Sequence, residues 1–325
     1  MEYVQLGRTG AKVSRLALGT MNFGWHTDEP TSHRMMDAAL DAGINFFDTA
    51  DVYGAGASES ILGSWFAGDP GRRDRVVLAT KVYLAMDEGP NAGGLSAIHL
   101  RKACEDSLRR LQTDHIDLYQ FHHVDRSTPW EEIWEATDRL VRDGKVVYVG
   151  SSNFAGWHLA QAQEAAARRH TLGLVSEQSL YNLLERTVEL EVLPAARSYG
   201  IGLLPWSPVA GGLLAGAATD AGRRTEGSAV LAHSARERRI AANLERLQEY
   251  EALAADLGVT PTALALGWLL AQPGVTAPIV GPRTLEQLTG SLAALDVRID
   301  DATGATLDKL FPGPGGEAPD AYTWS

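Results

Sequence analysis

Short apolar segments rich in β-branched and aromatic residues alternate along the chain with longer segments of helical periodicity. The alternation predicts eight strands, at residues 16–21, 44–48, 76–81, 116–121, 146–149, 174–178, 201–206 and 277–280. It predicts helices at residues 31–42, 58–66, 96–111, 129–141, 155–169, 187–199, 232–257, 261–271 and 284–295. Eight strand–helix units in this order are typical of an α/β protein of the (β/α)8 TIM-barrel class, and the glycine-bearing turn at 7–10 predicts an N-terminal β-hairpin.

Composition and charge narrow the class of protein. The 325 residues suit a single barrel domain over 1–325, with a Pro- and Gly-rich tail at 312–325. The net charge of -12 argues against a nucleic-acid partner. No apolar run approaches the ~20 residues of a membrane span, and the N-terminus has no signal-like segment. We therefore expect no membrane partner and a cytoplasmic location, and leave the oligomeric state open.

Polar side chains stand at the ends of successive predicted strands. Asp48 ends one apolar strand, with Tyr53 five residues later, Lys81 ends the next strand and His122 the one after. A buried carboxylate needs a nearby cation, because leaving it unpaired is costly. Since the carboxyl ends of barrel strands meet at one face, these four residues form a candidate proton-transfer site.

Each of these residues also has a structural explanation. Asp48 and Lys81 could form a purely structural ion pair, Tyr53 could pack a loop, and His122 could be a core histidine. Four such coincidences at successive strand ends explain the pattern less well than one site does. No cluster has the spacing of metal ligands, so we expect no metal.

Six stretches resemble a known family, and they occur in the family's order. They are Gly43-Ile-Asn-Phe-Phe-Asp-Thr-Ala-Asp-Val-Tyr-Gly54, Ala79-Thr-Lys81, Asp117-Leu-Tyr-Gln-Phe-His122, Gly150-Ser-Ser-Asn-Phe154, Glu177-Gln178 with Tyr181-Asn182, and Trp206-Ser-Pro208. The chain resembles the aldo-keto reductases over nearly its whole length, and most of all the bacterial members related to potassium-channel β subunits. The resemblance implies an NADP-dependent oxidoreductase that uses NADPH to reduce a small-molecule aldehyde or ketone to an alcohol.

The same resemblance implies catalytic roles for the four strand-end residues. Tyr53 would donate a proton to the carbonyl oxygen, and Lys81 would lower the pKa of its phenol. Asp48 would keep Lys81 charged and in place. His122 would polarise the carbonyl, while for His123 a place at the substrate pocket and a structural place are equally open.

Cofactor and substrate contacts follow from the resemblance as well. Those implied for the nicotinamide are Ser152, Asn153, Gln178 and Trp206. Those implied for the pyrophosphate are Ser207, Gly211 and Leu213, and those implied for the adenosine 2′-phosphate are Gly281, Arg283 and Gln287. Gly290 and Ser291 stand where the family often has Glu-Asn, so NADH is an alternative cofactor. The Gly- and Ala-rich segment 207–230 is expected to cover the cofactor. The residues expected to rim the substrate pocket are Trp25, Tyr83, His123 and Tyr181.

Two other functions remain as alternatives. One is a nucleotide-binding regulatory subunit of the channel β-subunit type, which would show little turnover. The other is an isomerase or aldolase barrel acting on phosphate sugars, which would work without nicotinamide. Trp206 with Ser152 and Asn153 argues against this last alternative.

Overall fold

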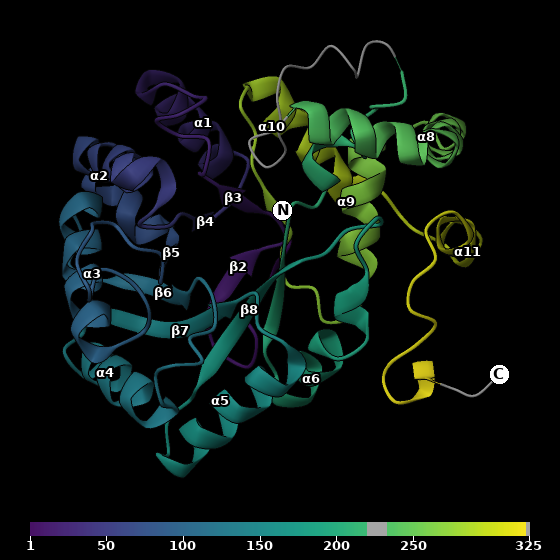
Figure 1. Cartoon of the computed structure of the whole chain (residues 1–325). Coiled ribbons are helices and arrows are strands. Elements are labelled where there is room, and N and C mark those ends of the chain that lie inside the picture. Colours follow the sequence, from purple (N-terminus) through teal and green to yellow (C-terminus); the bar gives the residue numbers. More distant parts are fainter. Residues whose placement is uncertain (220–232, 323–325) are drawn as a thin grey trace.

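The computed structural model of the protein describes residues 1–219 and 233–322. Eight parallel strands form one sheet in the order β10-β3-β4-β5-β6-β7-β8-β9 (Figure 1). Their bounds are β3 Ala17–Gly19, β4 Phe46–Asp48, β5 Val77–Val82, β6 Ile116–Phe121, β7 Val146–Ser152, β8 Leu174–Leu180, β9 Gly202–Trp206 and β10 Ile279–Val280. A parallel bridge joins Leu203 of β9 to Val275, just before β10, and brings the two edges of the sheet together. The predicted (β/α)8 barrel is therefore confirmed.

The predicted hairpin is present and lies against the interior of the barrel. It pairs β1 (Tyr3–Gln5) with β2 (Lys12–Ser14). Leu6 and Val13 are fully buried in one cluster with the inward-facing strand residues Phe46, Ala79, Leu118, Val175 and Leu204. Gly7 has φ +55°, and a Cβ there would lie 2.3 Å from the carbonyl oxygen of Val175. Glycine thus lets the turn approach the barrel closely.

A ring of helices surrounds the sheet (Figure 1). The helices are α1 Glu29–Asp41, α2 Ala57–Gly68, α3 Ala97–Leu111, α4 Trp130–Arg142, α5 Gly156–Arg168, α6 Val192–Tyr199, α8 His233–Asp256, α9 Pro261–Ala271, α10 Leu285–Leu292 and α11 Asp301–Leu310. Polar side chains cap the N-termini of several of these helices. Ser96 accepts from the His99 N–H at α3, and Thr284 accepts from the Gln287 N–H at α10. Short 3₁₀ turns add η1 Tyr53–Gly56, η2 Pro70–Arg75, η3 Thr187–Glu189, η4 Ala210–Gly212, η5 Ala293–Asp296 and η6 Asp320–Tyr322.

The structure differs from the predicted helices in three places, one of which is the helix predicted over 284–295, divided into α10 and η5. The helix predicted over 187–199 is divided into η3 and α6, and Pro194 lies in the first turn of α6, where its missing N–H is tolerated. Helix α11 was not predicted, although Asp300 caps it by accepting from the Thr303 N–H. Of the long segment predicted to cover a cofactor, residues 207–219 include η4, and residues 220–230 lie outside the described part.

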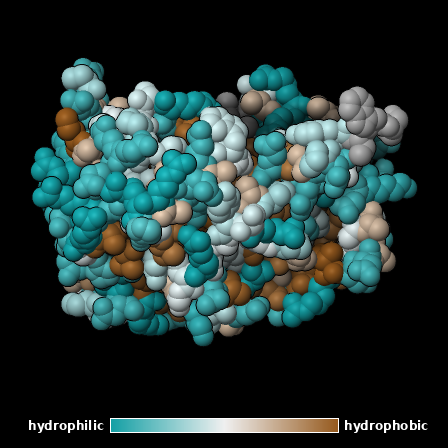
Figure 2. Space-filling view, turned by 90° about the horizontal axis from the view of Figure 1, so that it is seen from below, coloured by the Kyte–Doolittle hydropathy of each residue, from teal (hydrophilic) through white to brown (hydrophobic). Residues whose placement is uncertain are grey.

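The described part of the tail packs along α6. Glu317 forms an ion pair with Arg197, with 2.8 Å between Oε1 and Nη1, and the Ala318 N–H donates to the Leu190 carbonyl. On the face that Figure 2 shows, hydrophobic side chains lie in small groups among hydrophilic ones. Within the described residues, no helix taken alone is long and apolar enough to cross a membrane, and only the strongly bent pair Ser234–Asp256 and Pro261–Ala271 meets that composition together.

Candidate active site

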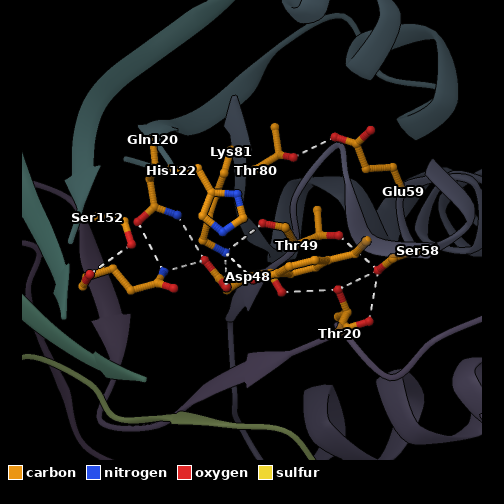
Figure 3. A network of polar contacts seen from close by, with 12 residues as sticks. Thr20, Asp48, Thr49, Ser58, Glu59, Thr80, Lys81, Gln120, His122 and Ser152 are labelled. Atoms are coloured by element: carbon orange, nitrogen blue, oxygen red, sulfur yellow. Dashed lines mark hydrogen bonds and ion pairs between the residues drawn. The ribbon is translucent and has the colours of Figure 1, made fainter. Parts of the chain in front are cut away.

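A buried ammonium lies at the centre of the site. Lys81, on β5, is fully buried, and its Nζ lies 2.6 Å from Oδ2 of Asp48 at the end of β4 (Figure 3). The same nitrogen donates to the Thr49 carbonyl at 2.9 Å and to the Tyr53 hydroxyl at 3.2 Å. All three donors of the ammonium are therefore used. Burial would lower the pKa of Lys81, but Asp48 and Tyr53 outweigh it and raise the pKa, so Lys81 stays charged.

The second oxygen of Asp48 is held by two amides. Oδ1 accepts from the side-chain amides of Gln120 on β6 and Gln178 on β8, each at 2.9 Å. Gln178 also donates to Oε1 of Gln120 at 3.3 Å. Four strands thus fix one carboxylate, and a charge that is costly to bury is compensated on both oxygens.

Tyr53 lies on η1, with its hydroxyl on Lys81 and its ring beside that of His122. It keeps partial exposure but is densely surrounded by protein. We expected Lys81 to lower the pKa of the phenol, and the net direction is the opposite. Burial raises the pKa of Tyr53 and outweighs the attraction of the Lys81 ammonium for the phenolate. The free protein therefore holds Tyr53 as a neutral phenol, which carries a proton.

His122 follows β6 and stands edge-on to Tyr53, with the ring centroids 5.8 Å apart and the planes at 81°. Burial, together with the charges of Lys81 and His123, lowers the pKa of His122 to about 3. The imidazole is therefore neutral near pH 7. Its buried Nδ1 has no hydrogen-bond partner among the described residues. This favours the tautomer in which Nε2 carries the hydrogen.

A second buried charged group lies behind the first. Glu59 on α2 is fully buried and accepts from Thr80 Oγ1 at 2.5 Å and from Arg110 Nε at 2.7 Å. Asp51 is 1% exposed, and neither of its carboxylate oxygens has a hydrogen-bond partner in the described structure. Burial, and after it the charge of Glu59, raise the pKa of Asp51 to about 7 against the opposing charge of Arg110. Asp51 therefore binds a proton far more tightly than an ordinary carboxyl.

The residues predicted for the nicotinamide are brought together beside this cluster. Asn153 accepts from Trp206 Nε1 at 3.0 Å and donates to Ser152 Oγ at 2.9 Å and to the His122 carbonyl at 3.2 Å. Ser152 Oγ in turn donates to the Gln178 carbonyl at 2.9 Å. Trp206, at the end of β9, is partly exposed. A flat ring beside amide and hydroxyl groups suits an aromatic amide ligand.

The residues predicted for the pyrophosphate lie on one turn after β9. Ser207, Ala210 and Gly211 have φ values of 50°, 52° and 64°. Left-handed backbone of this kind forms anion-binding concavities. Leu213 ends η4 and is buried, so its side chain anchors the turn. Asn182 donates to the Ser207 carbonyl at 3.0 Å and ties the turn to the end of β8.

The three residues predicted for the 2′-phosphate lie at the start of α10. Gly281 is exposed, and its carbonyl accepts from Asn22 Nδ2 at 3.0 Å. The Arg283 N–H donates to Gln287 Oε1 at 2.8 Å. Gln287 is thus a cap for the backbone as well as a candidate ligand. A guanidinium at the N-terminus of α10 suits a phosphate.

Of the four residues predicted at the substrate rim, three are exposed or partly exposed and one is buried. Tyr83 and His123, after β5 and β6, have ring centroids 5.5 Å apart. Trp25 is 61% exposed on the loop after β3 and stacks on His26. Tyr181 is fully buried, packs on Trp268 and hydrogen-bonds to Glu189, so it forms no part of a rim. Tyr181 was predicted at the rim because it follows a strand, β8, but its ring is buried in the protein.

Sequence reasoning missed three supporting residues. Gln120 could have been found, because it precedes His122 by two and therefore shares its face of the strand. The roles of Thr49 and Asp51 depend on neighbours from other strands and helices, which spacing does not reveal. Within the described residues, no group of three or more His, Cys, Asp or Glu side chains is arranged to hold a metal.

Comparison with known proteins agrees with this geometry. A model of the Aldo/keto reductase family matches residues 15–311. The chain is 54% identical to an uncharacterized oxidoreductase, YrpG, of Bacillus subtilis (strain 168), over the full length of both chains. It is 34% identical to versiconal hemiacetal acetate reductase of Aspergillus parasiticus, over 92% of this chain and 94% of that protein. It is also 34% identical to a probable voltage-gated potassium channel subunit beta of Oryza sativa subsp. japonica, over 95% of each.

The fold and the strand-end site are those of a TIM-barrel oxidoreductase. The chain belongs to the aldo/keto reductase family. Membership supports an enzyme that acts on small carbonyl compounds with a nicotinamide cofactor.

Proposed function

We propose that the protein is an NADPH-dependent reductase of aldehydes or ketones in which Tyr53 is the proton donor. One observation carries this proposal: the Lys81 ammonium lies between the Asp48 carboxylate and the Tyr53 phenol in a buried site. A purely structural ion pair between Asp48 and Lys81 would not require the partly exposed phenol of Tyr53 as a further hydrogen-bond partner of the ammonium.

The chemistry assigned to Tyr53 follows from its surroundings. When bound, the reduced nicotinamide would supply hydride to the carbonyl carbon. Negative charge then develops on the carbonyl oxygen, and Tyr53 Oη transfers its proton there. A raised pKa keeps the phenol protonated until an alkoxide, a much stronger base than phenolate, draws the proton away. Lys81 stabilises the phenolate that remains, at 3.2 Å.

His122 and the substrate residues orient the carbonyl. A neutral imidazole with hydrogen on Nε2 donates a hydrogen bond to the developing oxyanion without competing for the proton of Tyr53. Tyr83, His123 and Trp25 offer aromatic surfaces for the remainder of the substrate. These surfaces suit an aryl or otherwise flat carbonyl compound.

The residues around Trp206 fit a nicotinamide. The indole N–H is used by Asn153, which leaves the ring face for stacking. Ser152, Asn153 and Gln178 would bind the carboxamide and orient the ring toward Tyr53. Ser207, Gly211 and Leu213 would hold the pyrophosphate, and Gly281, Arg283 and Gln287 the 2′-phosphate. The guanidinium of Arg283 supports NADPH over NADH.

Turnover of a simple aldehyde tests the proposal. We expect NADPH oxidation with a nitrobenzaldehyde by the wild type, and a fall of at least about 100-fold in kcat for Tyr53→Phe. Tyr181→Phe, which removes a buried phenol outside the site, is the matched control and should keep kcat. Equal activity of wild type and Tyr53→Phe would contradict the role of Tyr53.

A regulatory nucleotide-binding subunit is the second candidate, supported by the 34% identity to a probable channel β subunit. It predicts tight NADPH binding without turnover on a panel of aldehydes and ketones. The same assay therefore separates the two functions.

A further inference from the structure

A buried carboxylate that the proposed chemistry does not use lies directly behind the nicotinamide residues. Glu177 immediately precedes Gln178 on β8, so the two side chains point to opposite faces of the strand. Gln178 faces Asp48 inside the barrel. Glu177 faces outward and is fully buried. It accepts from Ser151 Oγ at 2.5 Å, from Ser179 Oγ at 2.7 Å and from the Phe154 N–H at 3.0 Å.

The hydrogen bond to Phe154 acts on a strained turn. Asn153, the preceding residue, has φ +61°, a conformation that residues other than glycine adopt only when their surroundings hold them. The Phe154 ring packs against Trp130 and His158, with centroids 6.0 and 5.9 Å away. Glu177 thus holds the backbone of Phe154, and the aromatic packing holds its ring.

Packing does not hold the other side of the turn. A cavity of about 280 Å³ lies against it, lined by residues of the turn and of the segment after β8, among them Asn153, Phe154, Ala155 and Ser179. The carboxylate of Glu177 therefore restrains the backbone directly after Asn153, beside the Asn153 N–H, which donates to the Gln178 carbonyl at 3.0 Å. Asn153 in turn joins Trp206 to the His122 carbonyl.

We propose that Glu177 is a positioning residue that holds the Asn153 turn, and through it Trp206, in the arrangement that binds the nicotinamide. This inference rests on the proposed function, because it takes the Trp206–Asn153 pair as the nicotinamide site. Glu177 touches neither substrate nor cofactor in this assignment and acts only through the turn.

Two substitutions of Glu177 distinguish its role in positioning the turn from an effect of its charge. Glu177→Ala removes all three acceptor contacts and should raise both the KM and the Kd for NADPH at least 10-fold, while kcat at saturating NADPH falls less than 3-fold. Glu177→Gln keeps an acceptor oxygen for the Phe154 N–H, and its amide can donate to a serine hydroxyl, so KM should stay within 3-fold. If Glu177→Ala does not fold, Glu177→Asp replaces it, because the shorter side chain cannot reach all three donors.

A spectroscopic readout tests the contact itself. In an amide-correlated NMR spectrum, the indole N–H signal of Trp206, identified by its loss in Trp206→Phe, should shift in Glu177→Ala. The indole signal of Trp65, which lies on α2 and donates to Asp37 on α1, should not. This NMR measurement does not depend on turnover. It therefore tests the role of Glu177 even if the wild type reduces no carbonyl and the proposed function fails.

Glu59→Ala is the matched control for the loss of a buried carboxylate. Glu59 is equally buried and also accepts from a hydroxyl, but it lies on α2 away from the turn. Its loss should lower thermal stability and leave the KM for NADPH unchanged. An unshifted Trp206 signal in Glu177→Ala, or an equal rise in KM in Glu59→Ala, would overturn the inference.

Discussion

The ammonium nitrogen of Lys81 lies 2.6 Å from a carboxylate oxygen of Asp48, and the two side chains are 0% and 3% exposed. A pair so completely removed from water is held by its hydrogen bonds as much as by its charges. The two glutamine amides on Asp48 and the Thr49 carbonyl on Lys81 provide them. The protein itself therefore supplies the partners that hold this ion pair in place.

Asp48→Asn should weaken both folding and catalysis. Removing one partner of a buried ion pair leaves the other charge uncompensated and costs about 3–5 kcal/mol of unfolding free energy. Burial would then lower the pKa of Lys81 with only Tyr53 opposing it, and a neutral Lys81 would stabilise the phenolate of Tyr53 less. We expect kcat/KM to fall at least about 10-fold. Denaturant unfolding and steady-state kinetics measure the two effects.

Asp106→Asn is the control for this prediction. Asp106 pairs with Lys102 and Arg109 on the exposed face of α3. Such pairs contribute about 1 kcal/mol or less, and activity should not change. Equal unfolding free energies for Asp48→Asn and wild type would show that the buried pair does not stabilise the fold.

Asp51 should make stability depend on pH in a direction opposite to most carboxyls. Its pKa is raised from 3.8 to about 7 in the folded protein, so the folded state binds the proton more tightly. The stability from this proton is present below pH 3.8 and is lost as the pH rises through about 7. The Asp51→Asn variant has no charge to bury at this position. Above about pH 7 its free energy of unfolding should exceed that of the wild type, by up to about 4 kcal/mol.

Thermal unfolding of both proteins across this range measures the gain. Asp125→Asn provides a control of opposite sign. Burial opposes the shift, but hydrogen bonds from Ser127, Leu95 and Thr128 lower the pKa of Asp125 to about 2. Asp125→Asn should therefore be less stable than wild type at neutral pH and recover relative to it in acid. A gain for Asp51→Asn that is the same at low and high pH would contradict the assignment.

His122 should remain neutral throughout the working pH range. With a pKa of about 3, its imidazole does not titrate between about pH 5 and pH 8, whereas an ordinary histidine with a pKa near 6.5 does. The ring-carbon proton signal of His122, identified by its absence in His122→Asn, should stay constant in a pH-dependent NMR series. Free histidine in the same buffer supplies a comparison signal. A midpoint near 6.5 for His122 would rule out the neutral-donor role.

The barrel could be read from the sequence because each strand and helix carries its own signal. Phe46 and Phe47 mark a buried strand, and Ser96 marks the start of α3, without reference to any distant residue. The catalytic candidates were found for the same reason, since Asp48, Lys81 and His122 lie at the ends of three strands and Tyr53 follows the first of these.

What the sequence could not supply depends on contacts between elements. The net pKa of Tyr53 is decided by how much protein surrounds it, and burial exceeds the effect of Lys81. Tyr181 was misplaced because its position after β8 does not reveal that Trp268 on α9 packs against its ring. Glu177 and Asp51 were passed over because a carboxylate's burial and partners appear only in three dimensions.

Arg283 should set the choice between the two nicotinamide cofactors. NADPH differs from NADH by a 2′-phosphate, and a guanidinium at the start of α10 offers it charge and paired hydrogen bonds. Arg283→Ala should raise the KM for NADPH about 10-fold or more, as expected for losing one charge-assisted contact, and leave the KM for NADH nearly unchanged. Arg298→Ala, an exposed arginine beyond α10 that bonds only its own segment, is the control and should change neither constant. Steady-state kinetics with both cofactors measure the ratio, and an equal rise for NADPH and NADH would mean that Arg283 supports the fold of this corner rather than the phosphate.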